Sequence, residues 1–209
     1  MEATEQARSL SAMRSPCTFT CMSDWQLAPA GTPAPAPRCY WVVRGLLLAG
    51  AYPESPKLEE RGERASALWR AGIRTFVSLV EEDEPSPIGA DLASYVPAVA
   101  ALSTHVGDRG TCLRLPIRDL SVPTTDAMRT ILGVIDLSLE AGRPVYVHCL
   151  GGIGRTGTVV GCWMRRHGLA SRDDVLAVLA QLRRADVTHV HRASPEMPAQ
   201  REMVLGWSG

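Results

Sequence analysis

The sequence predicts an α/β fold in which a central, mostly parallel sheet is flanked by helices. Three observations carry this prediction. Short apolar runs typical of strands alternate along the chain with longer segments of helical period. The run Pro144–His148 is β-branched and aromatic, as expected of a buried central strand. A loop with three glycines joins this run to an apolar segment that we expect to be a buried helix.

The first half of the predicted domain opens with strands and closes with a strand. Residues 58–71 have a one-sided apolar pattern and stop at Gly72, so they predict a helix. An acidic turn, Glu81–Glu84, closes the third strand. The expected elements in chain order are strands at 41–43 and 46–48, a helix at 58–71, a strand at 75–80, a helix at 91–102 and a strand at 111–115 that ends at Pro116.

The second half holds the strongest helical patterns. Residues 125–141 carry apolar side chains at helical spacing and stop at Gly142. After the strand at 144–148, residues 155–167 are apolar on most sides. Ser171 and Asp174 form a capping box before the next helix, and a last helix is expected from about Pro195.

The amino-terminal 37 residues differ from the rest. The stretch 28–37 alternates proline with alanine, which excludes a helix or a central strand because proline removes donors and fixes φ. We therefore expect a flexible leader at 1–37 and one folded domain at 38–209.

Composition excludes several functional classes. The 209 residues include 22 basic and 22 acidic side chains, so the formal charge is zero and no nucleic-acid partner is expected. No apolar run approaches the roughly 18 residues that span a bilayer, and the acidic start Met1–Glu5 is unlike a signal peptide. We expect a cytoplasmic monomer without a membrane partner. The six cysteines lack the spacing of a disulfide framework or a zinc site, which predicts free thiols.

The informative segment is the glycine-rich loop, in which five residues separate Cys149 from Arg155. Glycines let successive backbone N–H groups point inward, and the helix that follows adds its own free N–H groups and the positive end of its dipole. These features predict a phosphate cradle made by Leu150, Gly151, Gly152, Ile153, Gly154 and Arg155.

Each polar side chain of the loop has a chemical use there. The positive potential favours the thiolate of Cys149, which is the nucleophilic form. The planar fork of Arg155 can hold two phosphate oxygens at once. Thr156 can donate a hydrogen bond to the Cys149 sulfur and help it to leave.

The pattern His148-Cys149, five residues, Arg155-Thr156-Gly157 resembles the signature of cysteine-dependent protein tyrosine phosphatases, and the size is similar to their small dual-specificity branch. The resemblance implies that Pro116–Pro123 is a mobile loop whose Asp119 is the general acid. It also implies that Gln200 lies near the site as a water-positioning residue. We interpret His148 as a hydrogen-bonded orienting residue rather than a proton carrier. No metal or other cofactor is implied.

The implied reaction is hydrolysis of phosphotyrosine, with phosphoserine and phosphothreonine as further substrates, through a cysteinyl-phosphate intermediate. The loop carries no Lys, Arg or His between Cys149 and Arg155, and the acidic turn would repel highly anionic substrates. Three alternatives stay open. One is a phosphatase for phosphoinositides or other small phosphate esters, and another is a module that binds phosphorylated partners with little activity. The third is sulfur or arsenate chemistry on a similar cysteine loop, which would not need an acid such as Asp119.

Less specific interpretations also apply to single residues. A buried cysteine is often an inert apolar residue, and an aspartate before a proline-containing turn often serves the turn. We interpret Cys112 and Cys162 as core residues. The alternative is that one of them is a redox partner of Cys149.

Overall fold

Five strands form one sheet in the order β1-β2-β5-β3-β4. The computed structural model describes residues 25–55, 57, 60–84, 94–103 and 108–209. The first strand runs antiparallel to its neighbour, and the other four are parallel. The strands are β1 (Cys39–Val43), β2 (Leu47–Gly50), β3 (Thr75–Ser78), β4 (Thr111–Arg114) and β5 (Val145–His148). The predicted α/β class is confirmed.

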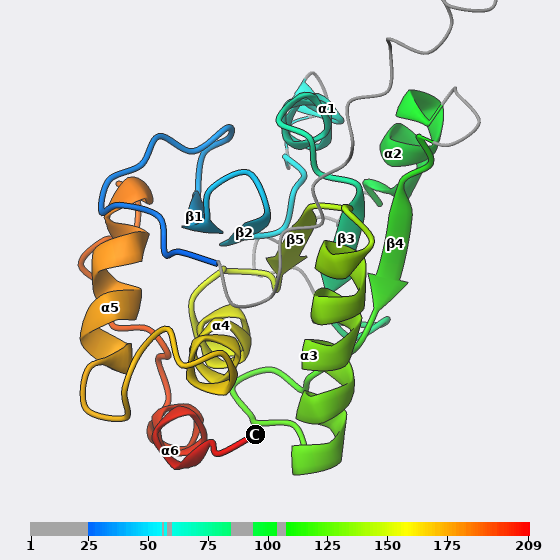
Figure 1. Ribbon diagram of the computed structural model, residues 1–209. Helices are drawn as coiled ribbons and strands as arrows, with labels where there is room; N and C mark the ends of the chain where they lie inside the picture. Colours follow the sequence, from blue (N-terminus) through cyan, green and yellow to red (C-terminus); the bar gives the residue numbers. More distant parts are fainter. Residues whose placement is uncertain (1–24, 56, 58–59, 85–93, 104–107) are drawn as a thin grey trace, which may run out of the picture.

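Helices cover both faces of this sheet (Figure 1). On one side lie α1 (Glu63–Arg70) and α2 (Val96–Leu102), and on the other lie α3 (Thr125–Glu140), α4 (Gly154–Arg166), α5 (Val175–Leu182) and α6 (Pro198–Gly206). The predicted helix at 58–71 begins later, at Glu63, because Gly62 adopts φ 79° just before it. The last helix begins at Pro198 rather than near Pro195. Leu58 and residues 91–93 of the predicted helix at 91–102 lie outside the described residues.

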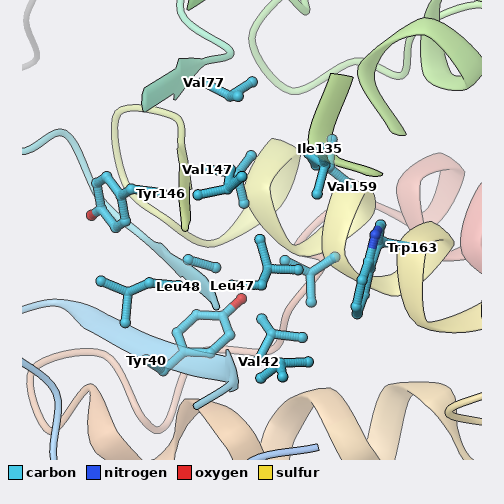
Figure 2. Close-up of a cluster of buried hydrophobic side chains, with 14 of the residues drawn as sticks. Tyr40, Val42, Leu47, Leu48, Val77, Ile135, Tyr146, Val147, Val159 and Trp163 are labelled. Carbon is cyan, nitrogen blue, oxygen red and sulfur yellow. The ribbon is translucent and has the colours of Figure 1, made fainter. Parts of the chain in front are cut away.

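The core lies between the sheet and the larger helical layer. Val77 of β3 pairs with Val147 of β5, so the two side chains share one face of the sheet. Figure 2 shows Val147 grouped with Ile135 of α3 and with Val159 and Trp163 of α4. Tyr146 points to the opposite face, where it contacts Phe76 and His148. The central strand β5 is therefore buried on both faces, as its composition predicted.

Trp25 packs against this core from the amino-terminal side. Its indole is 6% exposed and stacks on Trp163 with a centroid distance of 5.2 Å. The N–H of Ala28 donates to the carbonyl of Val42 in β1. The predicted flexible leader at 1–37 is therefore wrong for residues 25–37: proline excludes regular structure there, but it does not prevent an extended segment from packing through a tryptophan.

Among the described residues, no helix combines the length and apolar character needed to cross a membrane.

Candidate active site

The site lies where the four parallel strands end. Gly50, His148 and Ser78 are paired across β2, β5 and β3, and Arg114 of β4 is paired with Ser78. Because the carboxyl ends of parallel strands meet at one edge, the segments that follow these residues are neighbours in space. Cys149 directly follows β5, and α4 begins five residues later.

The backbone of the loop Cys149–Arg155, here called the Cys loop, is held by bonds to its carbonyl groups. The N–H of Tyr52 donates to the carbonyl of Leu150, Arg38 donates to that of Gly151, and the hydroxyl of Ser194 donates to that of Ile153. With these carbonyls tied to the surrounding protein, the N–H groups on the opposite sides of the peptide planes are free to converge. One of them, that of Gly152, donates to Cys149 Sγ at 3.2 Å. Loop N–H groups that remain available in this way are what an anion-binding nest needs.

Two glycines of the loop lie in close contact with other segments. Gly152 adopts φ 74°, and a Cβ there would lie 2.5 Å from the carbonyl carbon of Gly50. A Cβ on Gly154 would lie 2.6 Å from Oε1 of Glu196 and 3.0 Å from Oε1 of Gln200. The glycines thus let β2 and the start of α6 approach the loop closely.

Cys149 itself is 3% exposed, at the base of the loop. Its backbone N–H donates to the hydroxyl of Thr156 at 2.8 Å, and that hydroxyl donates in turn to the carbonyl of Gly50 at 3.3 Å. The predicted bond from Thr156 to the sulfur is therefore replaced by two backbone bonds. Thr156 thus fixes the backbone at Cys149, and its single hydroxyl proton is engaged with Gly50.

Arg155 connects the loop to the two segments that follow β3 and β4. Its Nη1 donates to the carbonyl of Ile117 at 3.1 Å, and its side chain is 2% exposed. The carboxylate of Glu84 binds Nη1 at 2.5 Å and Nη2 at 2.6 Å. Burial acts to lower the pKa of Arg155, but its hydrogen bonds to Glu84 and the charges of Cys149, Glu84 and Asp119 outweigh it and raise the pKa. The guanidinium stays charged, as a phosphate site requires.

Asp119 reaches the same guanidinium from the segment Pro116–Pro123, here called the acid loop. Its Oδ1 lies 2.8 Å from Arg155 Nη2, while the side chain remains 55% exposed. The next residue, Leu120, adopts φ 56° and is 52% exposed. A carboxylate held at the entrance and open to solvent is well placed to exchange protons with a bound substrate and with water.

His148, next to Cys149 in the chain, is buried among aromatic rings. Its Nδ1 lies 3.2 Å from the carbonyl of Cys149, and its Nε2 lies 2.9 Å from the hydroxyl of Tyr95. Burial lowers the pKa of His148 to about 3, so the ring is neutral near pH 7. A neutral ring meets both partners when Nδ1 donates to the carbonyl and Nε2 accepts from Tyr95.

The other described cysteines differ from Cys149 in environment. Burial raises the pKa of Cys112 to about 11 and that of Cys162 to about 12. Cys162 is 0% exposed within α4 and Cys39 is 1% exposed in β1. All four described cysteines are free thiols.

Gln200 joins the site through the acid loop. Its side chain is 0% exposed, its Nε2 donates to the carbonyl of Ser121 at 3.0 Å, and its Oε1 accepts from the N–H of Met197 at 3.2 Å. The structure thus brings together the residues predicted for the site, namely Cys149, Arg155, Asp119, Thr156, His148 and Gln200.

Glu84 was missed as a site residue, because the acidic run was interpreted as a solvated turn. One signal was available. The run directly follows the predicted strand at 75–80, and the sheet was expected to be mostly parallel, so this strand and the one before Cys149 should end at the same edge. Glu81, Glu82 and Asp83 remain exposed and line a cleft with Arg114, Arg118, Asp119 and Leu150.

Comparisons with known proteins agree with this geometry. The profile of the PTP-SAK family, described as "Swiss Army Knife protein, DSP-PTPase phosphatase domain", matches residues 36–204. The uncharacterized protein MJECL20 of Methanocaldococcus jannaschii is 42% identical over 57 residues, which are 27% of this chain and 39% of that relative. This chain therefore spans less than half of that relative's length.

Solved structures show the same fold. TpbA of P. aeruginosa, solved in complex with pTyr, is 18% identical with a TM-score of 0.56, covering 86% of this chain and 90% of its own. PTPMT1, solved in complex with PI(5)P, is 19% identical with a TM-score of 0.54, covering 78% and 90%.

Proposed function

Because this chain belongs to the PTP-SAK family of DSP-PTPase phosphatase domains, we propose that it hydrolyses phosphotyrosine in proteins, with phosphoserine and phosphothreonine as further substrates. The coarser statement, that it is a cysteine-based phosphatase, follows from the family. The narrower statement, that the substrate is a phosphorylated protein, is supported by the charges around the Cys loop.

In the reaction, the Cys149 sulfur attacks phosphorus while protonated Asp119 gives its proton to the departing phenol oxygen. The phosphorus–oxygen bond breaks as the phosphorus–sulfur bond forms, which leaves a cysteinyl-phosphate. The Cys loop amides and Arg155 hold its charge. Asp119, now a carboxylate, takes a proton from the attacking water, and inorganic phosphate leaves as the sulfur regains its negative charge.

The observation that carries the substrate proposal is the sign of the charge at the entrance. The side chains between Cys149 and Arg155 carry no positive charge, and Glu81, Glu82 and Asp83 line the cleft beside them. Arg114, on the same cleft, lies 3.2 Å from Glu82, so part of its charge is offset. A substrate with several phosphates would meet repulsion here, whereas a single aryl phosphate needs only the cradle itself.

The PI(5)P complex of PTPMT1 makes phosphoinositide the rival substrate to test. The experiment compares initial rates of phosphate release by the full chain from phosphotyrosyl, phosphoseryl and phosphothreonyl peptides and from PI(5)P in vesicles. We expect the phosphotyrosyl peptides to be hydrolysed fastest. Faster release from PI(5)P would overturn the substrate proposal and leave the phosphatase assignment intact.

A Cys149→Ser variant provides the control for activity itself. It removes the nucleophile and should abolish release from every substrate. If the unmodified chain bound phosphopeptides without turnover, it would be a binding module instead. We further propose that the protein works in the cytoplasm, where the four free thiols Cys39, Cys112, Cys149 and Cys162 stay reduced.

A further inference from the structure

We propose that Gln200 is a positioning residue that holds the acid loop closed over Cys149, acting through the carbonyl of Ser121. The proposal rests on the proposed function, because the closed loop matters only if Asp119 gives its proton to a leaving group. It assigns Gln200 a task other than the positioning of water that the family resemblance implied.

Apart from Ile117, which is 2% exposed in the core, the acid loop has little apolar burial to hold it in place. Asp119 and Leu120 are more than half exposed, and Arg118 is exposed as well. The base of the loop is fixed where the N–H of Ile117 donates to the carbonyl of Leu79. Beyond that point the loop depends on a few polar bonds, so each of them has a large share in setting its position.

Two of these bonds flank the tip. On one side, the Asp119 carboxylate contacts Arg155 Nη2. On the other, Gln200 Nε2 donates to the carbonyl of Ser121 at 3.0 Å. A bound phosphate would compete for the Arg155 guanidinium and weaken the first bond. The second bond does not involve Arg155, so it can persist when substrate is bound and Asp119 must face the leaving group.

The surroundings of Gln200 hold its side chain in one orientation. The orientation of its amide is set, because Met197 N–H needs an acceptor and the Ser121 carbonyl needs a donor. The side chain is 0% exposed, and its amide oxygen lies 3.0 Å from where a Cβ on Gly154 would be. It is thus packed between the start of α4 and the acid loop.

Mutation can separate the role of the Gln200 amide oxygen from that of its amide nitrogen. Gln200→Glu keeps an acceptor for Met197 N–H and removes the donor to Ser121, whereas Gln200→Met removes both at similar volume. Val204→Ala is the matched control: Val204 is 0% exposed on the same helix and packs near Gly161 of α4, away from the acid loop. It weakens the packing of α6 without touching Ser121.

The first readout does not require activity. Hydrogen exchange of the peptide 116–123 should become faster in both Gln200 variants and stay unchanged in Val204→Ala. Unchanged exchange in the Gln200 variants would overturn the proposed positioning role of Gln200, whether or not the chain hydrolyses any phosphate ester. An absence of turnover in the unmodified chain would overturn the proposed function alone.

The second readout is the dependence on the leaving group. A phenol with a pKa of about 10, as in phosphotyrosine, needs protonation more than p-nitrophenol does. We expect kcat on a phosphotyrosyl peptide to fall about tenfold in the Gln200 variants, because the closed loop loses one stabilising hydrogen bond. The fall in kcat on p-nitrophenyl phosphate should be smaller. An equal fall on both substrates, or a burst of p-nitrophenol with accumulated phosphoenzyme, would instead indicate a role in the water step and overturn the proposal.

Discussion

The carboxylate of Glu84 accepts hydrogen bonds from both terminal nitrogens of Arg155, at 2.5 Å and 2.6 Å. The two side chains are 6% and 2% exposed, so this is a buried ion pair. It orients the guanidinium while leaving its Nε–H for a phosphate oxygen, since the described bonds of Arg155 use only the terminal nitrogens.

A Glu84→Gln variant should therefore lose activity although Glu84 does not take part in the bond-breaking steps. Removing the charge leaves Arg155 without its buried counter-ion, and a hydrogen bond to a charged group contributes roughly 1.5–3 kcal/mol. We expect kcat/KM on p-nitrophenyl phosphate to fall about tenfold to a hundredfold. The control is Glu140→Gln at the exposed end of α3, which should retain full activity. Equal activity of the two variants would contradict the orienting role.

Thr156→Val should slow the reaction and destabilise the fold. The valine leaves the buried N–H of Cys149 and the carbonyl of Gly50 without their partner, which costs about 1–3 kcal/mol of unfolding free energy. Thr156→Ser keeps the hydroxyl and should recover most of kcat and stability. Steady-state kinetics and urea unfolding measure both, and a valine variant as stable as the serine variant would refute this account.

His148 makes the fold sensitive to acid. Its pKa is lowered from 6.5 to about 3 by burial, so the unfolded chain binds a proton between these values and the folded chain does not. Stability is fully present above pH 6.5 and decreases as pH falls below it, by about 1.4 kcal/mol per pH unit from this group. A His148→Gln variant should lose that part of the slope between pH 6 and pH 4 in urea unfolding, whereas exposed His191→Gln should keep it.

Thiol labelling should separate Cys149 from its neighbours. At pH 7, iodoacetamide is expected to modify Cys149 first, and phosphate or vanadate should protect it. Cys112 and Cys162 should stay unmodified in the folded protein, because burial raises their pKa to about 11 and about 12. Peptide mapping by mass spectrometry measures each site, and a disulfide between Cys149 and either residue after mild peroxide treatment would contradict this prediction.

Trp25→Ala should destabilise the whole domain. The indole is buried on Trp163 and His167, and a buried tryptophan replaced by alanine costs about 3–5 kcal/mol. The control Val187→Ala changes a side chain that is 81% exposed and should leave the unfolding free energy within about 0.5 kcal/mol. A Trp25 variant with unchanged thermal stability would indicate that residues 25–37 do not belong to the folded unit.

The amino-acid sequence by itself determined the residues that make up the Cys loop. Cys149, three glycines and Arg155 at the start of a helix predicted a nucleophile and an anion cradle within one short segment, because helix dipoles and glycine turns are local properties. The alternation of strands and helices predicted the sheet for the same reason, since the spacing of apolar residues and the positions of glycine and proline are local features of the chain.

Tertiary structure decided the contacts that bridge distant segments. The distance between Glu84 and Arg155, the contact of Gln200 with Ser121 and the stacking of Trp25 on Trp163 depend on how strand ends and helices meet. Composition predicted a solvated acidic turn and a flexible leader, because it describes segments in isolation. Packing at the carboxyl edge of the sheet buries one carboxylate of that turn against a guanidinium, and packing on α4 buries the tryptophan of the leader.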